Sequence, residues 1–115
     1  MDYKKQQAFF SRVRRLPYFE VKLGRLKKIP GASPIEKGVD VRLAVDMVSM
    51  GLKSQYDVAV LVSGDGDFSE AVQIVKDAGK HVELAYPKGG YPARQLQDVC
   101  DIVVEMEKGK HLIFL

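Results

Sequence analysis

The sequence has one cysteine, no tryptophan and no long apolar run. A lone Cys100 can close no internal disulfide and can build no thiolate metal cage, which excludes disulfide scaffolds and cysteine-caged metal sites. No stretch reaches the roughly 18 apolar residues of a membrane-spanning helix. The N-terminus also lacks the apolar segment of a signal peptide. We therefore expect a cytoplasmic protein with no membrane partner.

The composition has neither the low apolar content nor the high net charge of a disordered chain. Apolar residues make up 46% of the 115 residues, and the net charge is only +3, so the chain can form a core. The length suits one compact domain and leaves no room for two, and we expect a single domain over residues 1–115. A charge this small permits a nucleic-acid partner without requiring one.

The charge is distributed unevenly along the chain. Residues 1–30 contain nine Lys and Arg against two Asp and Glu, a net charge of +7, so the other 85 residues carry −4 of the total of +3. A solvated helix face explains such a basic segment as well as a binding surface does.

Helix and strand patterns alternate along the sequence. Apolar residues at helical spacing predict helices over residues 4–16, 41–52, 68–78 and 93–98. Strand patterns cover residues 18–23, 58–62, 81–86 and 102–104, with shorter extended candidates at 25–29 and 111–115. The run Val58–Val62 is continuously apolar, which is typical of a strand buried on both faces. The alternation predicts an α/β fold with an open, mainly parallel central sheet.

Two carboxylates, Asp65 and Asp67, follow the most apolar strand directly. Ligands of open α/β sheets bind beyond the carboxyl ends of the strands, and Gly64 and Gly66 allow a tight turn and a close approach there. Carboxylates one residue apart repel each other, and Mg²⁺ or Mn²⁺ relieves that repulsion. Two structural alternatives stay open: Asp67 caps the following helix, with Glu70 at capping-box spacing, or Asp65 stabilises the turn.

The remaining candidate ligands are less well placed. Asp40 stands at the start of a helix and Asp46 lies about 120° around it, so the two cannot easily face one ion; we favour a solvent-exposed position for Asp46. His81 and His111 have no neighbour at ligand spacing and are expected to be structural. Cys100 is expected to be a buried, inert thiol.

The motifs together resemble a known family. The segments 37–46 (KGVDVRLAVD) and 56–68 (YDVAVLVSGDGDF) look like the NYN domain, and more closely like the LabA-like (DUF88) branch of the PIN-like superfamily. Residues 19–26, 79–84 and 96–101 match further parts of the family pattern. The resemblance covers roughly residues 5–105.

The resemblance implies a Rossmann-like PIN-type three-layer sandwich and a metal-dependent ribonuclease. An acidic pocket would hold Mg²⁺ or Mn²⁺, and a metal-activated water would cleave RNA. Asp40, Asp65 and Asp67 become the catalytic, metal-binding acids. Asp46 matches a family acid of less certain role, and Ser63 matches a polar position at the strand end.

In that interpretation the basic N-terminal segment contacts the phosphates of single-stranded RNA. The candidate residues are Arg12, Arg14, Arg15, Lys22, Arg25, Lys27 and Lys28.

The sequence departs from the family at its start. The family pattern opens with a strand carrying an early Asp, and this chain begins at the helix after that strand. We therefore expect an N-terminally shortened member with open sheet edges, filled by residues 112–115 or by a second copy in a homodimer. A pocket short of one acid should bind metal more weakly, which leaves the enzymatic activity open. Competing functions are an inert RNA-binding or protein-interaction module that keeps the fold and, less favoured, a phosphatase or nucleotide-binding domain.

Overall fold

The computed structural model describes residues 3–23, 25–27, 30–31 and 35–107. The chain divides into two compact units, residues 1–39 and residues 40–115. In chain order the elements are α1 (Tyr3–Arg14), β1 (Arg25–Lys27), β2 (Ile35–Lys37), α2 (Val39–Leu52), β3 (Val58–Val62), η1 (Gly66–Phe68), α3 (Ser69–Asp77), β4 (His81–Pro87), α4 (Arg94–Val99) and β5 (Ile102–Met106). Among the described residues, no helix has the length and apolarity needed to cross a bilayer.

The first unit contains one helix and a short hairpin. Helix α1 lies close to its predicted range, and strands β1 and β2 pair antiparallel, with Leu26 opposite Glu36. The predicted strand over residues 18–23 is wrong. Tyr18 adopts a left-handed backbone (φ 66°) in a turn, and residues 19–23 form no strand. An alternating pattern specifies a strand only where a partner strand pairs with it. The predicted strand at 111–115 lies outside the described residues.

The second unit is built on a parallel three-stranded sheet with the order β3-β4-β5. Strand β4 is central: Val60 lies opposite Glu83, and Glu83 lies opposite Ile102. Crossover helices α3 and α4 join these strands, as parallel pairing requires. The predicted α/β fold with a mainly parallel sheet is confirmed.

Helix α3 ends as its sequence predicts. Gly79 has φ +89°, a conformation that glycine adopts without steric cost. Its N–H donates to the carbonyl of Lys76 (2.9 Å), and the N–H of Lys80 donates to the carbonyl of Val75 (3.0 Å). These two bonds form a Schellman motif, which satisfies carbonyls at the end of the helix.

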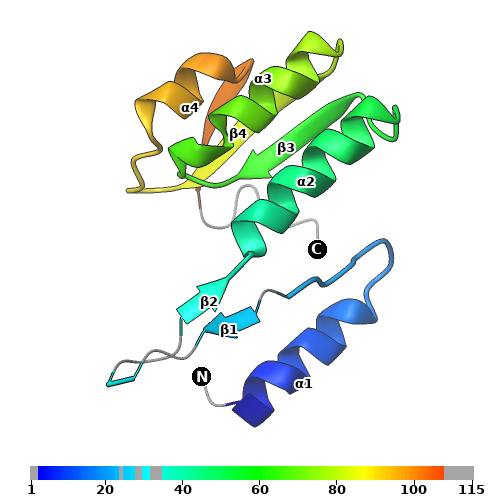
Figure 1. Ribbon diagram of the computed structural model, residues 1–115, viewed down its shortest axis with the longest axis vertical. Coiled ribbons are helices and arrows are strands. Elements are labelled where there is room, and N and C mark those ends of the chain that lie inside the picture. The colour runs from blue at the N-terminus through cyan, green and yellow to red at the C-terminus, as the bar shows by residue number, and fades with distance from the viewer. Residues whose placement is uncertain (1–2, 24, 28–29, 32–34, 108–115) are drawn as a thin grey trace. The chain divides into compact units, whose positions relative to one another are not determined.

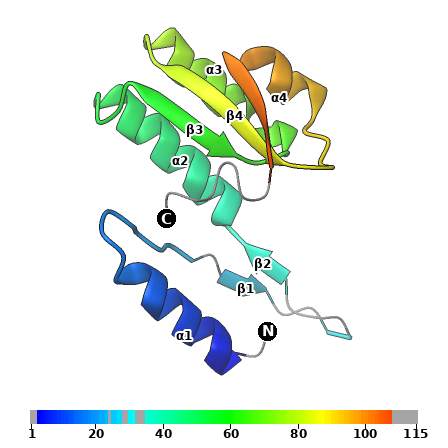
Figure 2. The same cartoon turned by 180° about the vertical axis from the view of Figure 1, so that it is seen from behind.

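Helices α2, α3 and α4 of the second unit all contribute side chains to one core on one face of the sheet. Figure 2 shows the opposite face of the sheet, with α2, α3 and α4 behind the strands. The core cluster comprises Met47, Leu61, Phe68, Ala71, Val72, Val75, Val82, Leu84, Leu96 and Cys100. At Gly51 a methyl group would lie 2.7 Å from Tyr56 Oη and 2.9 Å from Val75 Cγ1, so this close packing of α2 requires glycine.

The expectation that β3 is buried on both faces is wrong for the described structure. Leu61 is 3% exposed, whereas Val58, Val60 and Val62 are 46%, 62% and 57% exposed. Alternation along the strand places these three valines on the face opposite Leu61. No helix of this unit covers that face (Figure 2). The continuous apolar run therefore belongs to a strand with one face covered by helices and one apolar face left open. The other edge of β3 pairs with no strand in the described part of the chain.

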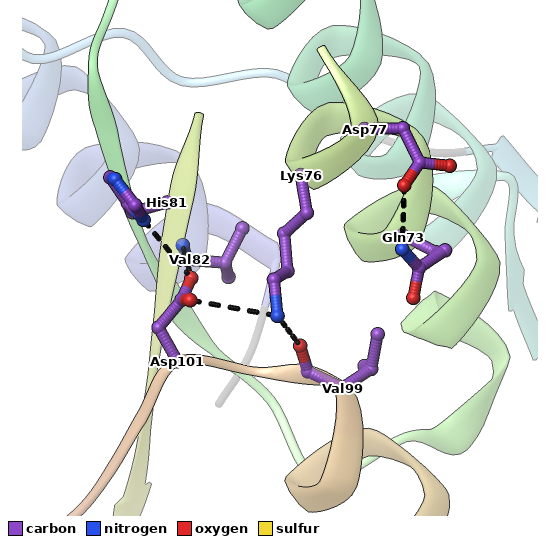
Figure 3. A network of polar contacts seen from close by, with 7 residues as sticks. All are labelled: Gln73, Lys76, Asp77, His81, Val82, Val99 and Asp101. Carbon is purple, nitrogen blue, oxygen red and sulfur yellow. Dashed lines mark hydrogen bonds and ion pairs between the residues drawn. The ribbon is translucent and has the colours of Figure 1, made fainter. Parts of the chain in front are cut away.

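Asp101 links the amino-terminal ends of β4 and β5, and its contacts with Val82, Lys76 and His81 are called the Asp101 clasp below (Figure 3). The N–H of Val82 donates to Asp101 Oδ2 (2.8 Å), and the N–H of Asp101 donates to the carbonyl of Val82 (2.9 Å). Lys76 Nζ lies 3.5 Å from Asp101 Oδ1, and His81 Nδ1 lies 3.7 Å from Oδ2. The backbone hydrogen bond from Val82 is the main cause that holds the pKa of Asp101 below its usual value, and Lys76 and His81 lower it further.

The thiol of Cys100, the residue before Asp101, is buried as the sequence predicts. Cys100 is 9% exposed and belongs to the core. Desolvation by burial raises the pKa of its thiol, so the group stays protonated and unreactive near neutral pH.

A matched pair of substitutions tests the difference between the two faces of the sheet. Val82 is fully buried and Val60 is 62% exposed. Val82→Thr should lower the free energy of unfolding by about 1–3 kcal/mol, because a hydroxyl replaces a buried methyl group. Val60→Thr should change it by less than about 0.5 kcal/mol. Urea unfolding followed by circular dichroism measures both values, and equal losses would contradict the one-sided core.

The charge of Asp101 should also change how the free energy of unfolding depends on pH in the acidic range. Because the folded pKa lies below the usual 3.8, its contribution is present above about pH 4 and is lost as pH falls through the folded value. The Asp101→Asn variant should therefore be less stable than wild type at neutral pH, and the gap should close on acidification. Urea titrations from pH 3 to pH 7, with Asp98→Asn as a charge-matched control, measure this gap. A gap that stays constant with pH would contradict it.

Candidate functional site

The parallel pairing of β3 with β4 brings two loops to the same edge of the sheet. Val62 at the end of β3 lies opposite Ala85 of β4, and both strands run in the same direction. The acidic turn, residues 63–68, follows β3. The rim loop, defined here as residues 88–95, follows β4 and includes the first two residues of α4. Figure 1 shows both connections at the carboxyl-terminal edge of the sheet. Asp101 contacts the opposite, amino-terminal ends of β4 and β5.

Asp65 organises the acidic turn. Its Oδ1 accepts a hydrogen bond from the N–H of Asp67 (2.8 Å), and its own N–H donates to Ser63 Oγ (3.1 Å). The carboxylate thereby caps η1. The interpretation that Asp65 stabilises the turn is confirmed, and the interpretation that Asp67 caps the next helix is wrong, because α3 begins without a side-chain cap.

The two carboxylates of the turn differ in their surroundings. Asp65 is half-buried with one oxygen committed to the turn, whereas Asp67 is exposed. No hydrogen bond or ion pair engages the Asp67 carboxylate within the described part of the chain. The Ser69 hydroxyl nearby is buried and has no hydrogen-bond partner among the described residues. The turn therefore retains polar atoms that its own fold does not use.

The rim loop packs directly against the acidic turn. The N–H of Ala93 donates to the carbonyl of Gly64 (2.9 Å). A methyl group at Gly66 would overlap Gln95 Nε2, and one at Gly64 would lie 3.5 Å from Pro92 Cα. Gly66 therefore makes room for Gln95. Sequence reasoning missed Gln95, because only the register of β3 and β4 brings it to the acidic turn.

The other predicted acids are not gathered with this pair. Asp40 lies exposed in the first turn of α2. Asp46 is half-buried and makes a polar interaction, so the expectation of a solvent-exposed acid is wrong. Within residues 3–23, 25–27, 30–31 and 35–107, no three His, Cys, Asp or Glu form a group that could hold a metal ion. The structure brings together Asp65 and Asp67.

A pair of carboxylates still fits one kind of metal site. Mg²⁺ commonly keeps several waters and binds through one or two carboxylates plus the phosphates of a substrate. Asp67 and the remaining oxygen of Asp65 supply such a donor set. The residues therefore fit a hydrated Mg²⁺ or Mn²⁺ completed by substrate, and they do not fit a closed protein cage.

The predicted RNA contacts lie in the other unit of the chain. Arg12, Arg14 and Arg15 are exposed in or directly after α1. Lys22 Nζ lies 3.6 Å from Glu20 Oε1, so a neighbouring carboxylate offsets part of its positive charge. Arg25 and Lys27 lie in β1, and Lys28 lies outside the described residues. These cations belong to residues 1–39 and the acidic turn belongs to residues 40–115.

Comparisons with known proteins bear on both the fold and the family. A structure of a Vibrio parahaemolyticus protein of unknown function superposes with a TM-score of 0.72 at 23% identity, over 94% of this chain and 64% of that one. The low amplitude and bright protein LabA of Synechococcus elongatus is 31% identical over 68 residues. That alignment covers 59% of this chain and 35% of LabA, so the chain spans about a third of its relative.

The NYN domain model matches residues 1–107. The chain therefore belongs to the NYN domain family, and LabA is among its relatives.

Proposed function

We propose that this protein is a metal-dependent ribonuclease that hydrolyses phosphodiester bonds of RNA at the acidic turn. The observation that carries the proposal is that Asp65 and Asp67 lie in one hydrogen-bonded turn at the carboxyl-terminal edge of a parallel sheet. This edge is where open α/β sheets bind their ligands. Membership of the NYN family supports a nuclease.

The chain's own groups have separable roles in this proposal. Asp65 fixes the turn through its hydrogen bond from the N–H of Asp67, which holds the backbone that carries the exposed Asp67 side chain. Asp67 would hold the ion, and Asp40 and Asp46 are further proposed acids of the site. When bound, Mg²⁺ or Mn²⁺ supplies an acidified water and neutralises phosphate charge. Arg12, Arg15, Lys22, Arg25, Lys27 and Lys28 are the proposed phosphate contacts.

A second function has its own support. Within the described residues, no third ligand joins Asp65 and Asp67 in a metal-binding group. That observation favours an inert RNA-binding or protein-interaction module that keeps the NYN fold. A cytoplasmic location is proposed for both functions, and single-stranded RNA is the proposed partner of the ribonuclease and of an RNA-binding module. The three exposed valines of β3 support the further prediction that two copies associate as a homodimer.

Cleavage of a labelled single-stranded RNA tests the enzyme against the inert module. With Mn²⁺ or Mg²⁺, wild type should cut the RNA, and EDTA should abolish cleavage. Asp65→Asn and Asp67→Asn should each lower the rate by about 100-fold or more, since loss of a carboxylate weakens both metal binding and charge stabilisation. Asp98→Asn, an exposed acid of α4, is the charge-matched control and should leave the rate unchanged.

Two outcomes would contradict the ribonuclease at the acidic turn. RNA binding without cleavage by wild type would overturn the ribonuclease and support the inert module. Cleavage that survives in both turn variants would assign the activity to another site or to a contaminant. Circular dichroism of each variant separates lost chemistry from lost folding.

A further inference from the structure

The rim loop presents a fully exposed aromatic ring beside the acidic turn. Tyr91 is 96% exposed, while its neighbour Pro92 and the following Leu96 are buried. An exposed aromatic ring that contributes nothing to the core offers both of its faces to a flat partner such as a nucleic-acid base. The buried Pro92 and Leu96 anchor the backbone that follows this position, so the ring projects from the start of an anchored segment.

Hydrogen bonds fix this segment on the acidic turn. The N–H of Ala93 donates to the carbonyl of Gly64 (2.9 Å), and Gln97 Nε2 donates to the carbonyl of Pro92 (2.8 Å). At its other end the loop is tied to β5, because the N–H of Lys88 donates to the carbonyl of Met106 (3.1 Å). Tyr91 is therefore carried by a segment whose position relative to Asp65 and Asp67 is set by the fold.

The loop also carries positive charge on either side of the ring. Lys88 and Arg94 are both exposed. Neither has an ion pair or a side-chain hydrogen bond within the described part of the chain. A cation without a protein partner, next to an acidic turn and an exposed ring, is available to a phosphate group.

We infer that residues 88–95 bind a single-stranded RNA segment, with Tyr91 stacked on a base and Lys88 and Arg94 on the flanking phosphates. The inference rests on the proposed function, because it places this strand across the acidic turn that would cleave it. Stacking on an exposed ring needs an unpaired base with a free face, which duplex RNA does not offer. Stacking tolerates any base, so this surface selects single strands over duplexes.

The surface differs from the basic segment of residues 1–39. Those cations lie in the other unit, whereas Lys88, Tyr91 and Arg94 lie in the same unit as Asp65 and Asp67. The arrangement is thus independent of how the two units are placed. It follows from the β3–β4 register and from the bond between Gly64 and Ala93.

Fluorescence anisotropy with a labelled 12-nucleotide oligouridine, in EDTA, tests the inference on the full chain. EDTA prevents metal-dependent cleavage, so binding is measured alone. Tyr91→Leu should weaken binding by about 5- to 100-fold, because it removes the aromatic face while keeping an apolar side chain. Tyr91→Phe should bind within about twofold of wild type. Arg94→Gln and Lys88→Gln should each reduce the slope of log affinity against log salt by about 0.7.

The outcomes are decisive in both directions. Equal affinity of wild type and Tyr91→Leu, or no RNA binding by wild type, would overturn the inference, and the latter would favour a protein partner for the loop. An equal loss for Tyr91→Leu on a duplex of the same length would also overturn it. If wild type binds as expected but does not cleave with Mn²⁺, the ribonuclease fails while this inference stands.

Discussion

Parallel hydrogen bonding between β3 and β4 is the constraint on which the proposed site depends. Because the two strands run in the same direction with Val62 opposite Ala85, the connections that follow them meet at one edge. The acidic turn and the rim loop are separated by about twenty residues of chain, yet the Gly64–Ala93 hydrogen bond joins them. The Asp101 clasp acts at the opposite end of the same strands. One end of the sheet is thus held by protein contacts, and the other carries the exposed carboxylate of Asp67.

Glycine has a different role at this edge from the one its sequence context first indicates. The GDGD pattern indicates backbone that approaches a ligand closely, but Gly66 instead accommodates the side chain of Gln95. Asp65 turns one oxygen inward to cap η1, which leaves Asp67 as the outward carboxylate. The pair therefore combines a structural acid with an exposed acid. This division fits a weakly held, hydrated cation better than a closed cage.

The sequence predicted the second unit more accurately than the first. The apolar patterns of the sequence correctly predicted α2, α3, β3 and β4, and α3 ends at Gly79 as expected. Residues 18–23 alternate like a strand but form no pairing, and pairing is a non-local property that alternation does not contain. The open face of β3 was missed for a similar reason, since an apolar run does not reveal how many faces its neighbours cover. The acidic turn was found from spacing, whereas Gln95 and Tyr91 join it only through strand register.

The central claim is that the carboxyl-terminal edge of the sheet binds a divalent cation at Asp65 and Asp67. Paramagnetic line broadening by Mn²⁺ in ¹H–¹⁵N spectra of the full chain tests it most directly, because broadening reports proximity to the ion whether or not catalysis occurs. At substoichiometric Mn²⁺, the amides of residues 63–68 and 91–95 should broaden first, and Asp67→Asn should abolish this selectivity. Broadening centred elsewhere in the chain, or unchanged in Asp67→Asn, would contradict the account.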